Sequence, residues 1–310
     1  MRISVILCTY NRCQSLAKAL ASLAASTLPL AVESEVLVVD NNSRDRTRRV
    51  VDDFCQRYPG RFRYLFEPKQ GKSHALNAGI RAAGGDVLAF TDDDVTVDPS
   101  WLQNLTVCLH SDDWAGAGGR IRPAQHFKPP RWLSLEERYA LGPLALFDLG
   151  ANPGELSEAP FGANMAFRRC MFERYGGFRT DLGPRPGSEI RSEDSEFGNR
   201  LLSAGEKLRY EPLAIVRHEI PDCRLQKKYF LAWWFDKARA DIRAFGTPDS
   251  TRRQIRGIPV VLFRRLAVWT LRWLVAVKPS RRFSCKVNVW SVAGRIRELY
   301  RQPTETPRAD

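Results

Sequence analysis

The sequence lacks the features of a secreted or disulfide-stabilised protein. Its 310 residues include seven cysteines, and these form neither a CxxC motif nor a close pair. Such cysteines are typical of free thiols in a reducing compartment. Met1-Arg2 leads directly into a short β-branched segment, without the hydrophobic region of a signal peptide, so we expect a cytoplasmic protein. Repeats and low-complexity tracts are also absent, and the length suits one large α/β domain with an extension.

Three adjacent carboxylates, Asp92, Asp93 and Asp94, are the most informative feature that is present. They follow the apolar run at residues 86–91. Adjacent carboxylates repel one another unless a cation neutralises them, and oxygen-rich sites suit hard divalent ions such as Mg²⁺ or Mn²⁺. A buried strand would deliver them to the carboxyl edge of a sheet, where α/β proteins bind ligands. The alternative is an acidic turn that points into water.

The first ninety residues alternate between strand and helix patterns, which predicts βαβ crossovers and a mainly parallel α/β sheet. The expected strands are Arg2–Thr9, Glu35–Val39, Arg61–Glu67 and Asp86–Thr91. The expected helices are Ser15–Ser26, Arg46–Tyr58 and Gly71–Ala83. Polar or acidic loops follow three of the strands, at residues 9–12, 40–43 and 92–94. Because these loops would open on one sheet edge, the pattern predicts a nucleotide site there.

Six segments together resemble the family 2 glycosyltransferases of the GT-A fold, which use nucleotide-diphospho-sugars. They are SVILCTYNR, VLVVDNNSRDRT, GKSHALNAGI, FTDDDV, FGANMAFRR and SEDSEFGNRLLSAGEKLRYEP, in the family's order. The resemblance covers roughly residues 1–225, so we expect a GT-A catalytic domain there and a helical extension over 226–310. Cys8 departs from the family, which often has proline at this position.

The resemblance implies a role for each donor-side residue. Thr9, Tyr10 and Asp40 match positions that hold the nucleotide base, with Asp40 accepting from an imide N–H. Asp93 matches the residue near ribose and diphosphate, and Asp94 the direct metal ligand. Asp92 is an alternative ligand, because a triplet leaves the frame of a DxD motif open. The remaining expected donor-binding residues are Asn11, Arg12, Asn42 and Lys72; the alternative for Lys72 is a solvated charge at a helix start.

The acid pair Glu193-Asp194 matches the catalytic acids of the family. The second acid, Asp194, would take the proton from an acceptor hydroxyl, and single displacement would invert the anomeric carbon. Glu193 is the second candidate. Both acids would also suit the first turn of a helix with Ser192 as its N-cap, and the two interpretations are compatible.

His218 follows the segment of the acid pair and a predicted strand at residues 213–216. Some GT-A enzymes place a histidine there as an additional metal ligand or diphosphate contact. The alternative is a histidine with a structural role.

The positive charge is concentrated near the C-terminus. Residues 252–301 contain 13 Lys or Arg and one acid, Glu298, and so carry +12 of the formal net charge of +13. Within them, Pro259–Val277 suits a helix with arginines on one arc and tryptophans on the apolar remainder. Its uncharged runs are shorter than the ~18 residues that a membrane-spanning helix needs. We expect this helix to lie on an anionic membrane surface, at the inner face of the cell membrane. The alternative is a helix packed against the protein.

The sequence therefore predicts an inverting glycosyltransferase that depends on Mn²⁺ or Mg²⁺. A UDP-sugar is the expected donor, and a lipid-linked or cell-envelope glycan with a free hydroxyl is the expected acceptor. One alternative is an inactive scaffold that binds nucleotide-sugars. Another is a nucleic-acid-binding protein that uses the basic tail, which we disfavour because no nucleic-acid-binding fold accompanies the basic residues.

Overall fold

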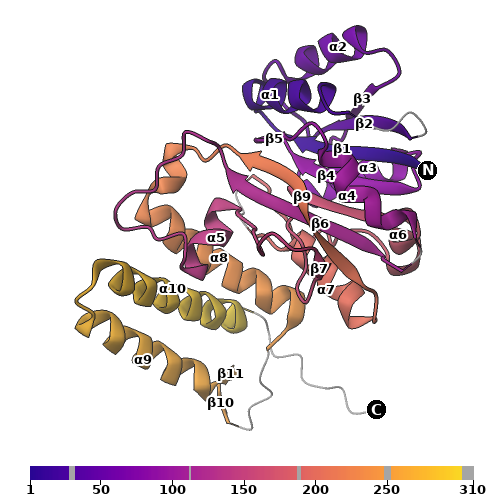
Figure 1. Cartoon of the computed structure of the whole chain (residues 1–310). Helices are drawn as coiled ribbons and strands as arrows, with labels where there is room; N and C mark the ends of the chain where they lie inside the picture. The colour runs from indigo at the N-terminus through magenta and orange to yellow at the C-terminus, as the bar shows by residue number, and fades with distance from the viewer. Residues whose placement is uncertain (28–31, 112, 187–189, 248–252, 302–310) are drawn as a thin grey trace, which may run out of the picture. The chain divides into compact units, whose positions relative to one another are not determined.

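The computed structural model describes residues 1–27, 32–111, 113–186, 190–247 and 253–301. The chain forms two compact units, which are treated separately below (Figure 1). The first unit comprises residues 1–127, 145–188 and 193–220, and the second comprises 128–144, 189–192 and 221–310. The main division falls after Ile220, and residues 128–144 group with the second unit.

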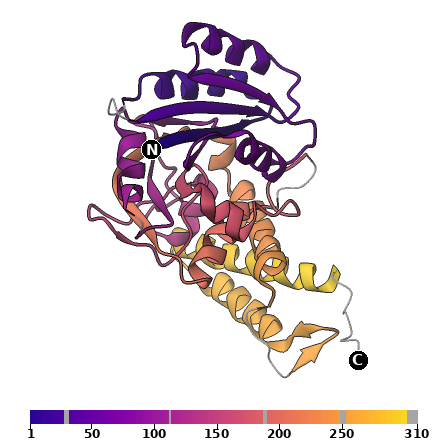
Figure 2. The ribbon, with the colours of Figure 1, turned by 90° about the vertical axis from the view of Figure 1, so that its right-hand side faces the viewer.

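The first half of the first unit alternates strands and helices as the sequence predicts. Its elements are β1 (Arg2–Thr9), α1 (Cys13–Ala24), β2 (Glu33–Asp40), α2 (Thr47–Arg57), β3 (Phe62–Phe66), α3 (Lys72–Ala82) and β4 (Val87–Asp92). Strands β3, β2, β1 and β4 are neighbours in this order, and each adjacent pair is parallel. Helices α1 and α2 cover one face of these strands and α3 covers the other (Figure 2). This burial of both faces explains why the strands read as apolar runs.

The register of the parallel strands brings their carboxyl ends together. Thr9 pairs with Asp40 across β1 and β2, while Cys8 pairs with Asp92 across β1 and β4. Helix α3 approaches the sheet closely at Gly79, where a Cβ atom would lie 2.6 Å from the Ile6 side chain. The predicted loops at the ends of these strands therefore open on one edge, and α3 starts beside it.

The second half of the first unit extends the sheet with both parallel and antiparallel pairs. Its elements are β5 (Val95–Val97), α4 (Trp101–Thr106), the 3₁₀ turn Val107–His110, β6 (Gly116–Pro123), β7 (Gly154–Glu155), β8 (Asn164–Arg168), α6 (Arg169–Tyr175), α7 (Glu193–Ser203) and β9 (Leu208–His218). The sheet runs β3-β2-β1-β4-β8-β6-β9-β5, with β7 paired to β9. Antiparallel pairing sets His218 of β9 opposite Val95 of β5, directly after the aspartate triplet.

The second unit is mostly helical. Its elements are α5 (Arg138–Leu144), the 3₁₀ turn Asp222–Leu225, α8 (Lys227–Phe245), β10 (Gln254–Ile255), β11 (Ile258–Pro259), α9 (Val260–Val275) and α10 (Pro279–Arg301). Helices α8 and α10 meet at Gly294, where a Cβ atom would lie 2.3 Å from the Phe235 carbonyl oxygen. The buried Glu298 accepts hydrogen bonds from Arg239 and Arg243 of α8. The one acid of the basic segment thus joins two helices of this unit.

Two sequence expectations about thiols and membranes are testable on the described residues. All seven cysteines are free. In the part of the chain that the structure describes, no helix is both long and apolar enough to cross a membrane. Helix α9 corresponds to the helix expected at Pro259–Val277, and it starts directly after the proline.

Candidate functional site

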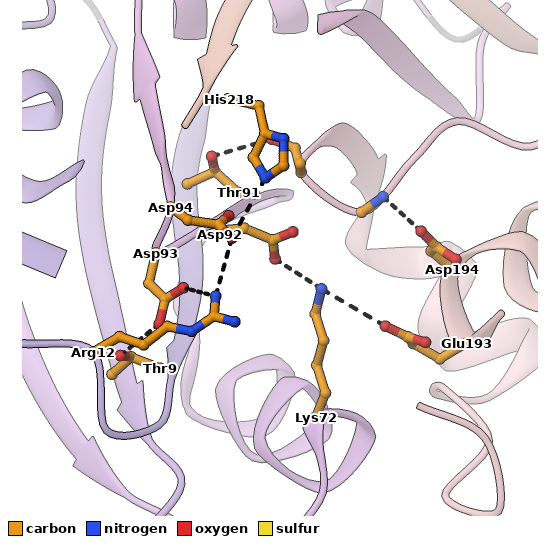
Figure 3. Close-up of polar contacts among 12 residues, drawn as sticks. Thr9, Arg12, Lys72, Thr91, Asp92, Asp93, Asp94, Glu193, Asp194 and His218 are labelled. Carbon is orange, nitrogen blue, oxygen red and sulfur yellow. Dashed lines mark hydrogen bonds and ion pairs between the residues drawn. The ribbon is translucent and has the colours of Figure 1, made fainter. Parts of the chain in front are cut away.

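Asp93 is the most deeply placed acid of the triplet. Its side chain is 6% exposed and accepts hydrogen bonds from Thr9 Oγ1 at 2.8 Å and Arg12 Nη1 at 3.0 Å. Burial raises the pKa of Asp93 to about 6, although the charge of Arg12 opposes this rise. Thr9 at the end of β1 and Arg12 in the loop that follows thus hold Asp93 in place through a hydroxyl and a guanidinium (Figure 3).

Asp94 lies between Arg12 and His218. Arg12 Nη1 donates to Asp94 Oδ2 at 3.0 Å, and His218 Nε2 lies 3.4 Å from the same oxygen. The His218 side chain is only 2% exposed and is held there by the pairing of β9 with β5. For Arg12, burial alone would lower the pKa of the guanidinium, but the negative charges of Asp93 and Asp94 outweigh burial and raise it.

Asp94 and His218 suit a divalent ion whose remaining ligands come from a substrate. Two ligands at right angles around an octahedral ion, each about 2.1 Å away, are about 3 Å apart. The 3.4 Å between Asp94 Oδ2 and His218 Nε2 is close to this spacing. Among the described residues, no group of three or more His, Cys, Asp or Glu side chains is arranged to hold a metal. Two protein ligands with phosphate oxygens match the usual coordination of Mg²⁺ and Mn²⁺ beside a diphosphate.

Lys72 connects the aspartate triplet to the second pair of acids. Its Nζ atom lies 2.7 Å from Asp92 Oδ1 and 3.7 Å from Glu193 Oε1 (Figure 3). Burial alone would lower the pKa of Lys72, but the charges of Asp92 and Glu193 outweigh it and raise the pKa. Lys72 is therefore a cation held inward by two acids, in contrast to the solvated charge that was the alternative for a lysine at a helix start.

Glu193 and Asp194 start α7 in different surroundings. Glu193 is 4% exposed, and burial raises its pKa to about 7 against the opposing charge of Lys72. Asp194 is half-buried; its Oδ2 accepts from the Gly162 N–H at 2.8 Å and its Oδ1 from the Ser195 N–H at 2.7 Å. Each carboxylate is thus fixed, and Asp194 is the more accessible of the two.

Ser192 does not cap α7 in the way the sequence suggested. Its φ is +87°, and its buried Oγ has no hydrogen-bond partner among the described residues. Left-handed backbone at a residue other than glycine costs about 1–3 kcal/mol and is concentrated at functional sites. Because this conformation occurs directly before Glu193, we infer that it serves the geometry of the acid pair, at a local cost in folding free energy.

The base-side residues lie in the loops after β1 and β2. Asp40 accepts from the Ser43 N–H and from the Tyr64 hydroxyl, each at 2.8 Å, and is 2% exposed. Tyr10 is 39% exposed at the same edge. Asn11 and Asn42 have φ values of +52° and +68°, a left-handed conformation that asparagine tolerates well.

The Asn11 side chain has a structural task in this arrangement. Its Oδ1 accepts from the Arg44 N–H at 2.7 Å, and the backbone N–H of Asn11 donates to Ser43 Oγ at 2.9 Å. These two bonds tie the loop after β1 to the loop after β2. The edge therefore brings together all the residues that the sequence predicted for donor binding, with Asn11 joining the loops.

Three residues of the site had no assigned role in the sequence interpretation. Gly162 donates its N–H to Asp194, and a Cβ atom there would lie 3.2 Å from Asp194 Oδ2 and 3.6 Å from Lys72 Nζ. Tyr64 donates to Asp40, as described above. Asn41 accepts from the Gly71 N–H at 2.7 Å and so positions the start of α3. Gly162 and Asn41 lie in segments that carry the family resemblance, whereas Tyr64 had no local signal.

Comparisons with known proteins agree with the fold and identify the family. The model of the family described as Glycosyl transferase family 2 matches residues 4–176. The glucosyl-dolichyl phosphate glucuronosyltransferase of Haloferax volcanii is 28% identical over 241 residues, which are 76% of this chain and 75% of that protein. The succinoglycan biosynthesis protein ExoM of Rhizobium meliloti is 30% identical over 236 residues, 75% of this chain and 70% of that protein.

A solved structure shares the architecture. The mannosyltransferase PcManGT from Pyrobaculum calidifontis, in complex with GDP-Man and Mn²⁺, matches with a TM-score of 0.65 at 19% identity, covering 97% of this chain and 88% of that chain. This likeness confirms the predicted GT-A fold. Because the family model matches more than half of the chain, and two glycan-synthesis proteins are similar over most of their length, this chain belongs to glycosyl transferase family 2.

Proposed function

We propose that this glycosyltransferase moves a sugar from a nucleoside-diphosphate donor to a hydroxyl group of a lipid-linked or cell-envelope glycan, with inversion. The observation that carries the proposal is the position of Lys72 between Asp92 and Glu193, 2.7 Å and 3.7 Å from their oxygens. It brings the acids suited to a metal-bound diphosphate next to the acids suited to activating an acceptor. A sugar at the junction of the two groups would meet both.

Asp94 and His218 would hold the divalent ion, and Asp92 is the alternative ligand. Asp94 is favoured over Asp92 because its Oδ2 atom lies 3.4 Å from His218, the second candidate ligand, whereas Asp92 pairs with Lys72. An imidazole ligand beside a carboxylate favours Mn²⁺ over Mg²⁺. When bound, the ion would stabilise the charge that develops on the leaving diphosphate. The Mn²⁺ in the PcManGT complex supports this assignment.

The loops after β1 and β2 would bind the nucleoside. Asp40 would accept the imide N–H of the base, held in orientation by Ser43 and Tyr64. Thr9, Tyr10, Asn11, Arg12, Asn42 and Asp93 would complete the donor site. The Lys72 ammonium would pair with phosphate oxygens as a second cation.

Asp194 would act as the general base. Its oxygens accept from the Gly162 and Ser195 N–H groups, so the carboxylate is oriented before an acceptor arrives. Taking the proton of the acceptor hydroxyl as the new bond forms makes that oxygen a competent nucleophile. Attack from the face opposite the leaving diphosphate would invert the anomeric carbon. Glu193, which is more buried, would mainly hold Lys72 in place.

Two relatives support a glycan or lipid-linked acceptor. Their names specify a glucosyl-dolichyl phosphate substrate in one case and succinoglycan synthesis in the other. An enzyme with such an acceptor would work at the cytoplasmic face of the membrane. A basic surface on the protein would then bring the active site to its acceptor.

Helix α9 provides a surface that suits this location. Its exposed side follows a spacing of three and four residues and combines apolar and basic side chains. Leu271, Leu274 and Val275 are 63–67% exposed, and Val277, just after the helix, is 94% exposed. The exposed arginines Arg264, Arg265 and Arg272 lie on the same helix. An apolar helix face with basic neighbours suits an anionic lipid surface, where both kinds of side chain contribute to binding.

A ligand screen tests the donor assignment directly. Thermal unfolding of the full chain should be measured with UDP, GDP and dTDP, each with Mn²⁺ and with EDTA. A nucleotide that binds only the folded state raises its stability as the site saturates. We expect UDP with Mn²⁺ to give the largest rise, and Asp40→Asn to abolish it. No shift with any nucleotide would count against the proposed donor site and favour the nucleic-acid alternative. A shift without transfer activity would instead favour the inactive scaffold.

A further inference from the structure

Arg12 bridges the two acids that matter most for the donor and the ion. It stands directly before α1, and its Nη1 atom lies 3.0 Å from both Asp93 Oδ1 and Asp94 Oδ2. The acids are 6% and 13% exposed, whereas the arginine side chain is 48% exposed. The half-exposed guanidinium of Arg12 thus pairs with two carboxylates that are largely buried (Figure 3).

One oxygen of Asp94 faces both Arg12 and His218, the other residue that would bind the ion. Asp94 Oδ2 is the atom 3.0 Å from Arg12 and 3.4 Å from His218. A divalent ion about 2.1 Å from this oxygen would lie at most about 5 Å from the Arg12 nitrogen. Two cations at this separation in a half-buried site repel each other strongly, because solvent screens them incompletely. Binding of the ion to Asp94 Oδ2 therefore weakens the hydrogen bond from Arg12 to the same oxygen, and this hydrogen bond weakens binding of the ion.

We propose that Arg12 competes with the divalent ion for Asp94, and that the nucleoside diphosphate decides the competition. The guanidinium group pairs with phosphate oxygens in the same way as with carboxylates. A diphosphate at this edge gives Arg12 a new partner and leaves Asp94 Oδ2 to the ion. Arg12 is then a positioning residue that makes ion binding depend on donor binding. This inference rests on the proposed metal-dependent donor site.

The proposal has a thermodynamic consequence. If the diphosphate removes Arg12 from Asp94, it raises the affinity for the ion, and the ion raises the affinity for the nucleotide by the same factor. Couplings of this kind are typically about 5–150-fold. Without Arg12, the ion no longer competes with this guanidinium for Asp94. Its affinity in the absence of nucleotide should then rise, and the coupling should shrink.

The test is the affinity of the full-length protein for Mn²⁺ with and without UDP or GDP, measured by electron paramagnetic resonance. We expect Arg12→Gln to bind Mn²⁺ alone about 10-fold more tightly than the wild type and to lose most of the coupling. Arg12→Lys keeps the charge and should retain part of the competition. Arg49→Gln is the matched control, because Arg49 is exposed on α2 of the same unit and the variant has the same charge change.

The outcomes separate this inference from the proposed function. If Arg12→Gln and Arg49→Gln both bind Mn²⁺ alone as the wild type does, Arg12 is no competitor and the inference fails while the metal site stands. If Arg12→Gln weakens Mn²⁺ binding with and without nucleotide equally, Arg12 only supports the shape of the site, and the inference fails again. A wild type that binds no Mn²⁺ with either nucleotide overturns the metal assignment as well. Unfolding temperatures of all variants confirm that each one is folded.

Discussion

Lys72 Nζ donates a hydrogen bond to Asp92 Oδ1 at 2.7 Å, which joins the start of α3 to the end of β4. The same ammonium lies 3.7 Å from Glu193 at the start of α7. One side chain thus connects the consecutive elements α3 and β4 with α7, which lies far from them in sequence. Because two acids share one cation, the loss of Lys72 would leave both of them without this partner.

Replacement of Lys72 by methionine should impair both donor binding and transfer. The variant keeps the apolar length of the side chain but leaves Asp92 and Glu193 without their cation. We expect kcat to fall by about 10²-fold, because removal of one group that stabilises developing charge has effects of about this size or larger. Lys69→Met, at an exposed position of the preceding loop, is the control and should retain transfer. A Lys72→Met enzyme with normal kinetics would show that the bridge is only structural.

Asp94→Ala should abolish Mn²⁺-dependent donor binding and leave the fold intact. Removing one of three adjacent carboxylates relieves repulsion, which offsets the loss of the contacts to Arg12. His218→Gln should weaken Mn²⁺ binding by less, since the negatively charged ligand Asp94 remains. Calorimetric titration of nucleotide with Mn²⁺ and with EDTA measures both effects. Donor affinity that EDTA does not change in the wild type would contradict the metal assignment.

Asp194→Asn should lower kcat by ~10²–10⁴-fold while donor affinity stays nearly unchanged, as expected for loss of a general base. The amide can still accept the hydrogen bond from the Gly162 N–H, so the loop geometry should persist. Transfer assays at saturating donor, alongside nucleotide binding, separate the two effects. If turnover survives within a few-fold, the base is elsewhere, and Glu193 is the next residue to test.

The raised pKa of Glu193 predicts a stability that falls with pH. Its pKa is about 7 in the folded chain and 4.5 in its ordinary state, because burial disfavours the charge. The native state therefore holds a proton that the unfolded chain loses between these values. The resulting stabilisation is complete below about pH 4.5 and is lost as the pH rises through 7. Asp93, with a pKa of about 6, adds to the same trend.

Glu193→Gln isolates this contribution, because glutamine is neutral at every pH and Asp93 is retained. Unfolding temperatures should be measured at pH 5 and pH 8. We expect the variant to lose several degrees less than the wild type between these two pH values. Glu173→Gln, at an exposed position of α6, should follow the wild type. An identical pH dependence in the wild type and Glu193→Gln would show that Glu193 ionises normally.

Much of this fold was predictable from local patterns. Buried parallel strands such as β1, β2 and β4 read as apolar runs, and the acids at their ends follow without interruption. Parallel pairing then requires Thr9, Asp40 and Asp92 to meet at one edge, whatever the rest of the chain does. The strand bounds differ from the predicted ones by only a few residues, as expected where helices and strands begin and end gradually.

The contacts between distant segments were not predictable in this way. His218 reaches Asp94 because β9 pairs with β5 in one register, and no local pattern encodes that register. The bond from Gly162 to Asp194 and the bond from Tyr64 to Asp40 likewise depend on tertiary packing. For His218, Asp194 and Asp40 the family resemblance implied roles, whereas their contacts with Asp94, Gly162 and Tyr64 required the structure.

Membrane binding by α9 is the prediction that depends least on the family. Truncation after Asp249, a residue outside the described part of the chain, would remove the basic segment. It would also remove α10, whose Glu298 and Gly294 hold α8 within the second unit. Truncation therefore confounds loss of the surface with damage to the core. Point changes on the exposed side of α9 avoid this problem, because Leu271 and Leu274 are 63% and 64% exposed.

We expect the full chain to sediment with anionic liposomes and to be only partly released by high salt. Basic side chains near an anionic surface contribute ~1 kcal/mol each, and salt screens this term, whereas apolar insertion is unaffected by salt. Leu271→Ser with Leu274→Ser should leave binding that high salt abolishes. Leu213→Ser is the control, because Leu213 is 67% exposed on β9 of the first unit. If the double variant sediments like the wild type at high salt, α9 does not insert. The apolar side chains on its exposed face would then need another partner, since Leu262, Leu266 and Trp269 already form the side of the helix that packs within the second unit.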